Sequence, residues 1–183
     1  AGATDVVSLT PFALRPDGVR AGSARIAAAV SDPIDTVFIG GGTPTLLAPT
    51  QIGAALTALR NHFGLADSAE VTIEANPDSV DQRALGQLRE VGVTRVSFGH
   101  QSSAAGVLAF LERTHTAGRT WDAVRWARAA GFEHVSVDLI YGSPAESDAD
   151  LAVTLDEVAA ADLDHVSAYS LIVEPGTRLA ARV

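Results

Sequence analysis

The chain has 183 residues, of which 47% are hydrophobic and 19% are charged, so it is long enough to bury the core of one domain. Its 22 acidic and 13 basic side chains give a formal net charge of −9, which argues against general nucleic-acid binding and favours a small-molecule partner. The sequence contains no cysteine, which excludes disulfides, thiolate nucleophiles and sulfur-ligated clusters from these residues.

Five short runs rich in β-branched and aromatic residues are predicted to be buried strands, because Gly, Pro, Asn or polar residues bound each of them. In chain order, these runs are residues 36–39, 71–74, 95–98, 135–140 and 166–171. A further short strand is expected near the start of the chain, from Val6, Val7 and Leu9.

Apolar residues at helical spacing lie between these runs, so a helix is predicted after each of the first four. The predicted buried faces are Ile52, Leu56 and Leu59; Leu85, Leu88 and Val91; Val124 and Ala127; and Leu151, Leu155 and Val158. Residues 20–30 are also expected to be helical. The expected end signals are a capping box from Ser79 and Gln82, left-handed ends at Gly92 and Gly131, and a helix start at Ser147 or Asp148.

Strands and helices alternate at a spacing of about 30 residues, which predicts repeated βαβ units and therefore a parallel sheet with right-handed crossovers. We expect a single α/β domain over residues 1–183, because no linker-like stretch divides the chain. An open doubly wound sheet and a closed or partial barrel both fit this order of elements. In either fold, a ligand is expected where the strands end.

Glycine and polar residues gather at the ends of four predicted strands. They are Gly40, Gly41, Gly42 and Thr43, then Glu74, then His100 and Gln101, and finally Asp138. The glycines alone also fit a tight turn, and a lone Glu at a strand end is more often a solvated group. Asp138 favours a functional role, because a carboxylate between Val137 and Leu139 lies in a buried-strand pattern and needs a partner.

Other polar residues are open to more than one interpretation. Arg113 and His115 follow a helix and, taken alone, suit a surface position. His100 fits either a ligand or a buried polar group with a partner. His62, His134 and His165 lack the spacing of a metal site, and the sequence has no HExxH, GxSxG, GxGxxG or Walker motif.

The sequence also suggests a cellular location for the chain. No stretch approaches the roughly 20 apolar residues of a membrane-spanning helix, and the first residues lack the layout of a secretory signal, so a cytoplasmic location is expected. Because the sequence contains no methionine, we expect it to be a segment of a longer protein.

Five segments, in this order and spacing, resemble the successive motifs of the HemN/HemW group of the radical S-adenosylmethionine (SAM) family. They are residues 38–45 (FIGGGTPT), 73–78 (IEANPD), 96–102 (VSFGHQS), 113–115 (RTH) and 138–144 (DLIYGSP). The similarity runs from about Asp35 to Val183 and includes residues 167–171 and 174–177. This group contains oxygen-independent coproporphyrinogen III oxidases and heme chaperones, and the EANP and RTH forms are more similar to the chaperone branch.

The resemblance implies a partial (β/α)6 barrel that holds SAM against a [4Fe–4S] cluster, whose electron cleaves the sulfonium to give a 5′-deoxyadenosyl radical. It also implies heme, heme-client proteins and heme biosynthesis or delivery as the biological setting. The residues that match SAM-contacting positions of the group are Gly41, Gly42, Thr43, Glu74, Gln101, Arg113 and Asp138. Backbone groups of the glycine turn would approach the methionine part of SAM, while carboxylates suit its ribose or ammonium groups and Arg suits its carboxylate.

The sequence departs from the group in three places. The CxxxCxxC loop that ligates the cluster is missing, so neither a metal ligand nor a catalytic residue is assigned. Residues 1–32 do not match the group, and its region beyond the barrel is expected to be missing. His100 stands where the group often has an apolar residue or Met.

Three functions therefore stay open at the level of sequence. The chain is part of a radical enzyme with oxidase-like chemistry, part of a heme chaperone, or a catalytically inactive partial barrel that only binds a nucleotide-like ligand.

Overall fold

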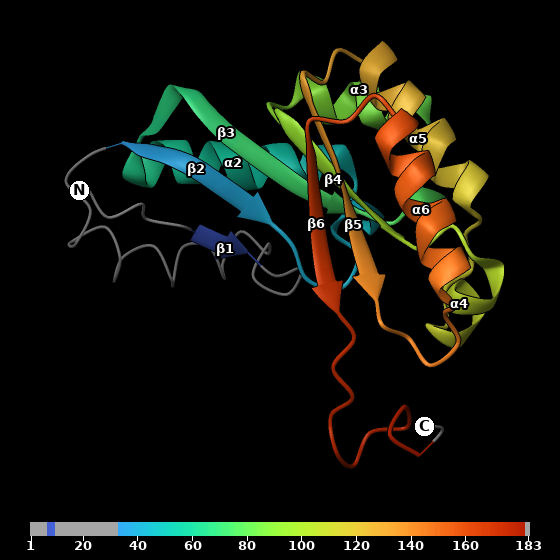
Figure 1. Ribbon diagram of the computed structural model, residues 1–183. Coiled ribbons are helices and arrows are strands. Elements are labelled where there is room, and N and C mark those ends of the chain that lie inside the picture. Colours follow the sequence, from blue (N-terminus) through green and yellow to red (C-terminus); the bar gives the residue numbers. More distant parts are fainter. Residues whose placement is uncertain (1–6, 10–32, 182–183) are drawn as a thin grey trace, which may run out of the picture.

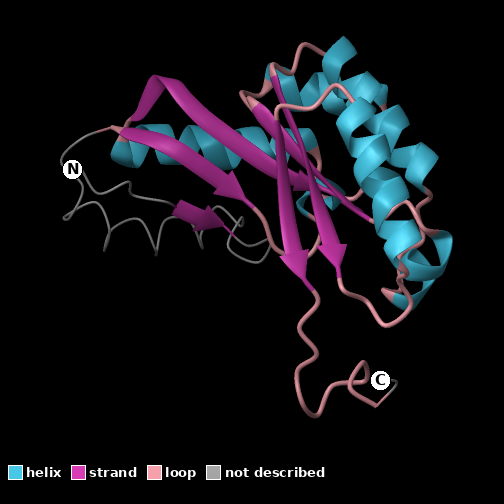
Figure 2. Cartoon of the chain, in the orientation of Figure 1, coloured by secondary structure: helices cyan, strands magenta, loops and turns pink. Residues whose placement is uncertain are grey.

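The computed structural model describes residues 7–9 and 33–181, which form a curved sheet with helices on one side (Figures 1 and 2). The six described strands are β1 (Val7–Leu9), β2 (Ile34–Ile39), β3 (Leu65–Ala75), β4 (Arg95–Gln101), β5 (His134–Tyr141) and β6 (His165–Ser170). Each strand pairs in parallel with the next, in the order β1 to β6. The parallel sheet predicted from sequence is confirmed, and its one-sided cover identifies the partial barrel rather than the doubly wound alternative.

The helices follow the strands on the outer side of the sheet (Figure 1). They are η1 (Pro44–Leu46), α2 (Pro49–Phe63), η2 (Pro77–Ser79), α3 (Gln82–Glu90), α4 (Ala105–Phe110), α5 (Ala117–Ala129) and α6 (Asp148–Ala160). The short helix α4 was not predicted from sequence, so two helices follow β4. The helix expected over residues 20–30 lies outside the described residues.

The core lies between the sheet and the helices, because alternate residues of each strand point toward the helical layer. On β3, for example, Val71 and Ile73 are buried in the same hydrophobic cluster as Leu85 and Leu88 of α3. Burial of each such side chain contributes about 2 kcal/mol to the free energy of unfolding. The opposite face of the sheet is therefore the one available for polar groups.

The predicted buried faces are correct for α2 and α5, and Leu85 and Leu88 of α3 are buried as predicted. Val91 follows α3 as its C-terminal cap and packs half-buried against the core. The prediction for α6 is wrong at Leu155, which is 51% exposed, whereas Thr154 is buried. The reason is a hydrogen bond, because Thr154 Oγ1 accepts the Ser103 N–H at 3.0 Å and this contact turns Thr154 inward.

Several predicted element ends are also resolved by the structure. The capping box assigned to Ser79 is wrong, because Asp81 caps α3 by accepting the Ala84 N–H at 2.7 Å. The start of α6 at Ser147 is confirmed, with a reciprocal capping box to Asp150. The left-handed ends predicted at two glycines are confirmed by φ angles of 104° at Gly92 and 85° at Gly131. Strand β6 ends at Ser170, one residue earlier than predicted.

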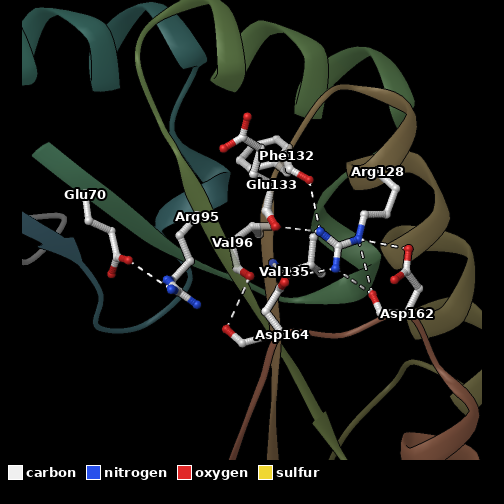
Figure 3. Close-up of polar contacts among 10 residues, drawn as sticks. Glu70, Arg95, Val96, Arg128, Phe132, Glu133, Val135, Asp162 and Asp164 are labelled. Carbon is white, nitrogen blue, oxygen red and sulfur yellow. Dashed lines mark hydrogen bonds and ion pairs between the residues drawn. The ribbon is translucent and has the colours of Figure 1, made fainter. Parts of the chain in front are cut away.

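Arg128 of α5 ties the beginning of β5 to the loop before β6 (Figure 3). Its guanidinium donates to the carbonyls of Phe132 and Glu133 and to the Asp162 carbonyl at 2.9 Å. It also pairs with the Asp164 carboxylate at 2.8 Å, and that carboxylate accepts the Val135 N–H at 2.8 Å. These contacts, led by the Val135 N–H, lower the pKa of Asp164. One side chain therefore fixes the amino-terminal ends of two neighbouring strands.

A polar cluster around His100 is embedded between β4 and the helical layer. His100 is 0% exposed, and its ring lies 4.5 Å from the Trp121 ring, centroid to centroid. The Ser103 hydroxyl donates to Glu157 at 2.6 Å, so it accepts from His100 Nε2 at 3.1 Å. Burial lowers the pKa of His100 to about 4, with a smaller effect from His115 and an opposing one from Glu157. His100 is therefore a neutral, buried polar group, which answers the question left open by the sequence.

The buried state of His100 predicts a loss of stability in mild acid. A histidine in the unfolded chain titrates near pH 6.5, whereas His100 in the folded chain titrates near 4, so the unfolded state binds more protons between these values. The free energy of unfolding should therefore fall as the pH is lowered, by about 2 kcal/mol between pH 7 and pH 5 from this residue.

The measurement is urea unfolding of the wild-type chain and of His100→Met at pH 7, 6 and 5. The variant should lose less stability across this range than the wild type. Identical pH dependence in the two proteins would show that His100 is not held in a neutral state by the fold.

Candidate functional site

The face of the sheet away from the helices is lined with polar side chains. Alternation along the strands places Thr72, Glu74, Ser97, Ser136 and Asp138 opposite the buried apolar residues. Two adjoining hollows lie on this face and share Glu74 and Asp138.

The first hollow, called the rim hollow, lies at the carboxyl ends of β2 to β5 and has a volume of about 200 Å³. Its lining residues are Gly42, Thr43, Pro44, Glu74, Ala75, Asn76, Gly99, Gln101, Arg113 and Asp138. The second, called the lower hollow, has a volume of about 340 Å³. It is lined by Phe38, Glu70, Thr72, Glu74, Arg95, Ser97, Ser136, Asp138, His165, Ser167 and Tyr169.

Six of the seven site residues predicted from sequence line the rim hollow, namely Gly42, Thr43, Glu74, Gln101, Arg113 and Asp138. The seventh, Gly41, is joined to it, because its N–H donates to Glu74 Oε2 at 3.0 Å. The prediction that strand-end groups from four strands meet on one rim is confirmed. Their role toward a ligand remains a prediction.

The glycine turn after β2 packs against the Phe38 ring and the Glu74 carboxylate. A Cβ atom at Gly40 would lie 2.8 Å from Glu74 Oε2 and 2.6 Å from a ring carbon of Phe38. Gly41 and Gly42 then adopt φ angles of 88° and 61°, which are left-handed. The turn therefore presents backbone to the rim hollow and holds the Glu74 carboxylate with an N–H group.

Asp138 is the half-buried carboxylate between the two hollows. Burial raises its pKa, and the nearby charge of Glu74 adds to this effect, while hydrogen bonds from Ser97 and Ser167 and the charge of His165 oppose it. The Ser97 hydroxyl donates to Asp138 Oδ1 at 3.2 Å. Two carboxylates with a shared hollow and unfavourable mutual charge favour a ligand that carries positive charge.

The loop that carries Arg113 is anchored to the loop after β3. The Thr114 hydroxyl donates to Asp78 Oδ2 at 2.9 Å, and Arg119 donates to the Val80 carbonyl at 2.7 Å. Arg113 itself is exposed and reaches the rim hollow from this loop. Its position is thus set by two segments that are more than 30 residues apart in sequence.

Sequence reasoning did not assign a role to several lining residues. Asn76 and Gly99 lie inside recognised motifs and line the rim hollow, but were not selected as site residues. The hydroxyls of the lower hollow were also missed. In the sequence, Ser97 and Ser136 alternate with apolar residues, and this pattern is the same as that of any half-buried strand. The pattern therefore does not mark these serines as site residues.

The residues present do not fit an iron–sulfur cluster. The 183 residues contain no cysteine, and no group of three His, Cys, Asp or Glu side chains in residues 7–9 and 33–181 is placed to hold a metal ion. Among the helices of these same residues, none is long and apolar enough to cross a membrane.

Comparison with known proteins gives consistent matches. The sequence profile described as the Radical SAM superfamily matches residues 21–158. The heme chaperone HemW of Mycobacterium tuberculosis is 50% identical over 161 residues, which cover 87% of this chain and 41% of that protein. HemW of Bacillus subtilis is 37% identical over 145 residues, which cover 79% of this chain and 38% of that protein. The chain thus spans less than half the length of these relatives.

The fold is also found among solved structures. Coproporphyrinogen III oxidase (HemN) of Escherichia coli, described as a radical SAM enzyme, superposes with a TM-score of 0.80 at 29% identity. The match covers 91% of this chain and 38% of HemN. The partial barrel, its strand-end motifs and these similarities agree, and the chain belongs to the radical SAM superfamily, within the group that unites HemW heme chaperones and HemN-type oxidases.

Proposed function

We propose that this chain is the SAM-binding half-barrel of a heme chaperone related to HemW, and that SAM binds in the rim hollow. The observation that carries the proposal is the convergence of Glu74, Arg113 and Asp138 on one hollow at the carboxyl ends of the strands. A cytoplasmic setting, with heme and heme-client proteins as partners, belongs to the same proposal.

The charges around the rim hollow complement those of SAM. SAM carries two positive groups, its sulfonium and its ammonium, and one negative group, its carboxylate. The hollow offers two carboxylates, Glu74 and Asp138, and one guanidinium, Arg113. Arg binds a carboxylate through two parallel N–H groups, and a carboxylate accepts from an ammonium or from ribose hydroxyls.

The shape of the site is consistent with a ligand that extends along the sheet. The rim hollow alone, at about 200 Å³, is smaller than a usual cofactor site, but it opens beside the lower hollow of about 340 Å³. Glycines at residues 40 and 99 keep side chains out of this space. In this proposal, the backbone of Gly41 to Thr43 lies along the methionine part of the ligand.

Bound SAM supplies a 5′-deoxyadenosyl group that a reduced cluster releases as a radical in this superfamily. The described residues bind and orient the ligand, and none of them supplies an electron. The heme-chaperone branch is favoured over the oxidase branch because identity to HemW of Mycobacterium tuberculosis is 50%, against 36% to the oxygen-independent coproporphyrinogen III oxidase of Pseudomonas aeruginosa.

A second candidate function is supported by the missing cysteines. The chain then acts as a catalytically inactive partial barrel that only binds a nucleotide-like ligand. The rim hollow serves both candidates, because recognition of the ligand and ligation of a cluster use different residues.

Removal of either rim carboxylate should weaken SAM binding. Glu74→Gln and Asp138→Asn keep hydrogen-bond acceptors for the Gly41 N–H and the Ser97 hydroxyl, but remove the charge. Loss of one charged contact of about 1.5–3 kcal/mol should raise the dissociation constant about 10- to 100-fold. Isothermal titration calorimetry with SAM measures this change.

Glu70→Gln is the matched control. Glu70 lies on the same strand and the same face as Glu74, but four residues before it, at the end of the lower hollow away from the rim, where it pairs with Arg95 at 2.9 Å (Figure 3). Its substitution should leave SAM affinity within about twofold of wild type, since surface-type ion pairs contribute little. Equal affinities in all four proteins would reject the assignment of Glu74 and Asp138.

A chain of these 183 residues, reconstituted with iron and sulfide, should not hold a stable [4Fe–4S] cluster or cleave SAM. A cluster of this kind needs thiolate ligands, and the sequence offers none. The measurements are iron content, the electron paramagnetic resonance spectrum after anaerobic reduction, and formation of 5′-deoxyadenosine. Formation of 5′-deoxyadenosine above the level of a protein-free control would overturn this expectation.

Heme binding distinguishes the chaperone from the other candidates. Titration with ferric heme should give a saturable change in the Soret absorption. A spectrum that matches free heme at every concentration would exclude heme binding by this chain and favour the inactive barrel.

A further inference from the structure

We propose that His115 is the positioning residue for Gln101: it holds the peptide before Gln101 in a strained turn that directs the Gln101 amide into the rim hollow. The inference rests on the proposed SAM site and adds a residue to it that lies on the opposite side of β4. Neither the charge of His115 nor contact with the ligand is involved.

Gln101 lies in an unusual backbone turn at the end of β4. Its φ angle is 66°, which is left-handed and rare for a residue with a side chain. The Ser102 N–H donates to the His100 carbonyl at 2.9 Å, so the bond spans two residues and forms the rarer kind of γ-turn with Gln101 at its centre. Such a turn costs about 1–3 kcal/mol and persists only where surrounding contacts hold it.

The turn coincides with an irregularity in the sheet. Phe98 pairs with Val137, and the next pair is Gln101 with Leu139, so three steps on β4 correspond to two on β5. The extra residue lets the Gln101 side chain fold back over Gly99. A Cβ atom at Gly99 would lie 2.8 Å from Gln101 Nε2, which shows how close the amide lies to the strand.

His115 supplies the contact that stabilises this turn from behind. Its Nε2 lies 3.0 Å from the His100 carbonyl, and both residues are buried. A carbonyl can only accept, so Nε2 carries the proton and donates. His115 Nδ1 is buried and has no hydrogen-bond partner, which leaves the bond to the His100 carbonyl as the polar contact that this ring makes in the described structure.

The other side of the turn is fixed to α6. Thr154 Oγ1 accepts the Ser103 N–H at 3.0 Å and lies 3.3 Å from the Ser102 hydroxyl. With Ser102 and Ser103 held by Thr154, the peptide between His100 and Gln101 is the part that can relax. Without the His115 donor, that buried carbonyl keeps only the strained γ-turn bond, and rotation of the peptide relieves the strain.

The test compares His115→Leu, which removes the donor at similar volume, with His115→Gln, whose side-chain amide can donate from a similar position. SAM affinity should fall about 5- to 30-fold in His115→Leu and stay within about threefold of wild type in His115→Gln. Val124→Ala is the control for a general loss of stability, because Val124 is buried on α5 and lines neither hollow. It should lower the melting temperature without lowering SAM affinity.

A double-mutant cycle separates action through Gln101 from other effects. In a Gln101→Ala background, His115→Leu should cause no further loss of affinity. In an Arg113→Ala background, it should cause its full loss, although Arg113 is only two residues from His115. Independent, additive losses with Gln101→Ala would overturn the proposal.

A ligand-free measurement keeps the inference separate from the proposed function. Amide exchange of Ser102 and the backbone chemical shifts of Gln101, followed by nuclear magnetic resonance, report the turn directly. His115→Leu should speed exchange at Ser102 and shift Gln101 away from left-handed values, whereas His115→Gln should not. If the wild-type chain binds no SAM, the proposed function fails. Unchanged spectra in His115→Leu would independently reject the positioning role of His115.

Discussion

The alternation of side chains in a parallel sheet covered by helices on one face is the constraint on which the site depends. Parallel sheets usually bury both faces and are apolar throughout. On β3, Val71 and Ile73 face the helices. Thr72 and Glu74, which alternate with them, face the uncovered side. Because none of the helices within residues 33–181 desolvates that side, carboxylates can remain half-buried there. Burial on this face still raises the pKa of Asp138.

Strands and the rim were predictable because both are local in sequence. A run of β-branched residues ends in a polar or glycine motif, and parallel strands place those ends side by side. The exposed Leu155 was not predictable, because α6 turns Thr154 inward to meet a backbone N–H from a loop about 50 residues earlier. The left-handed Gln101 was missed for a similar reason. Its turn is held by His115, and sequence spacing carries no sign of that contact.

The motifs that identify the superfamily are also joined to one another in space. Thr114 binds Asp78, so the loop with Arg113 is fixed to the loop after β3. His115 binds the His100 carbonyl, so the same loop is fixed to the end of β4. A motif residue can therefore affect ligand binding by moving a neighbouring loop rather than by touching the ligand. Affinity losses are informative only beside a control that loses stability equally.

The charges that line the rim hollow do not depend on an iron–sulfur cluster. Burial raises the pKa of Asp138, and the nearby charge of Glu74 adds to this effect, so negative charge at Asp138 is unfavourable in the ligand-free rim. In the proposed function, a cationic ligand beside both carboxylates offsets this unfavourable charge, and the Arg113 guanidinium favours ligands that also carry an anionic group. These charges together suit a zwitterion with excess positive charge, and they do not depend on an electron source.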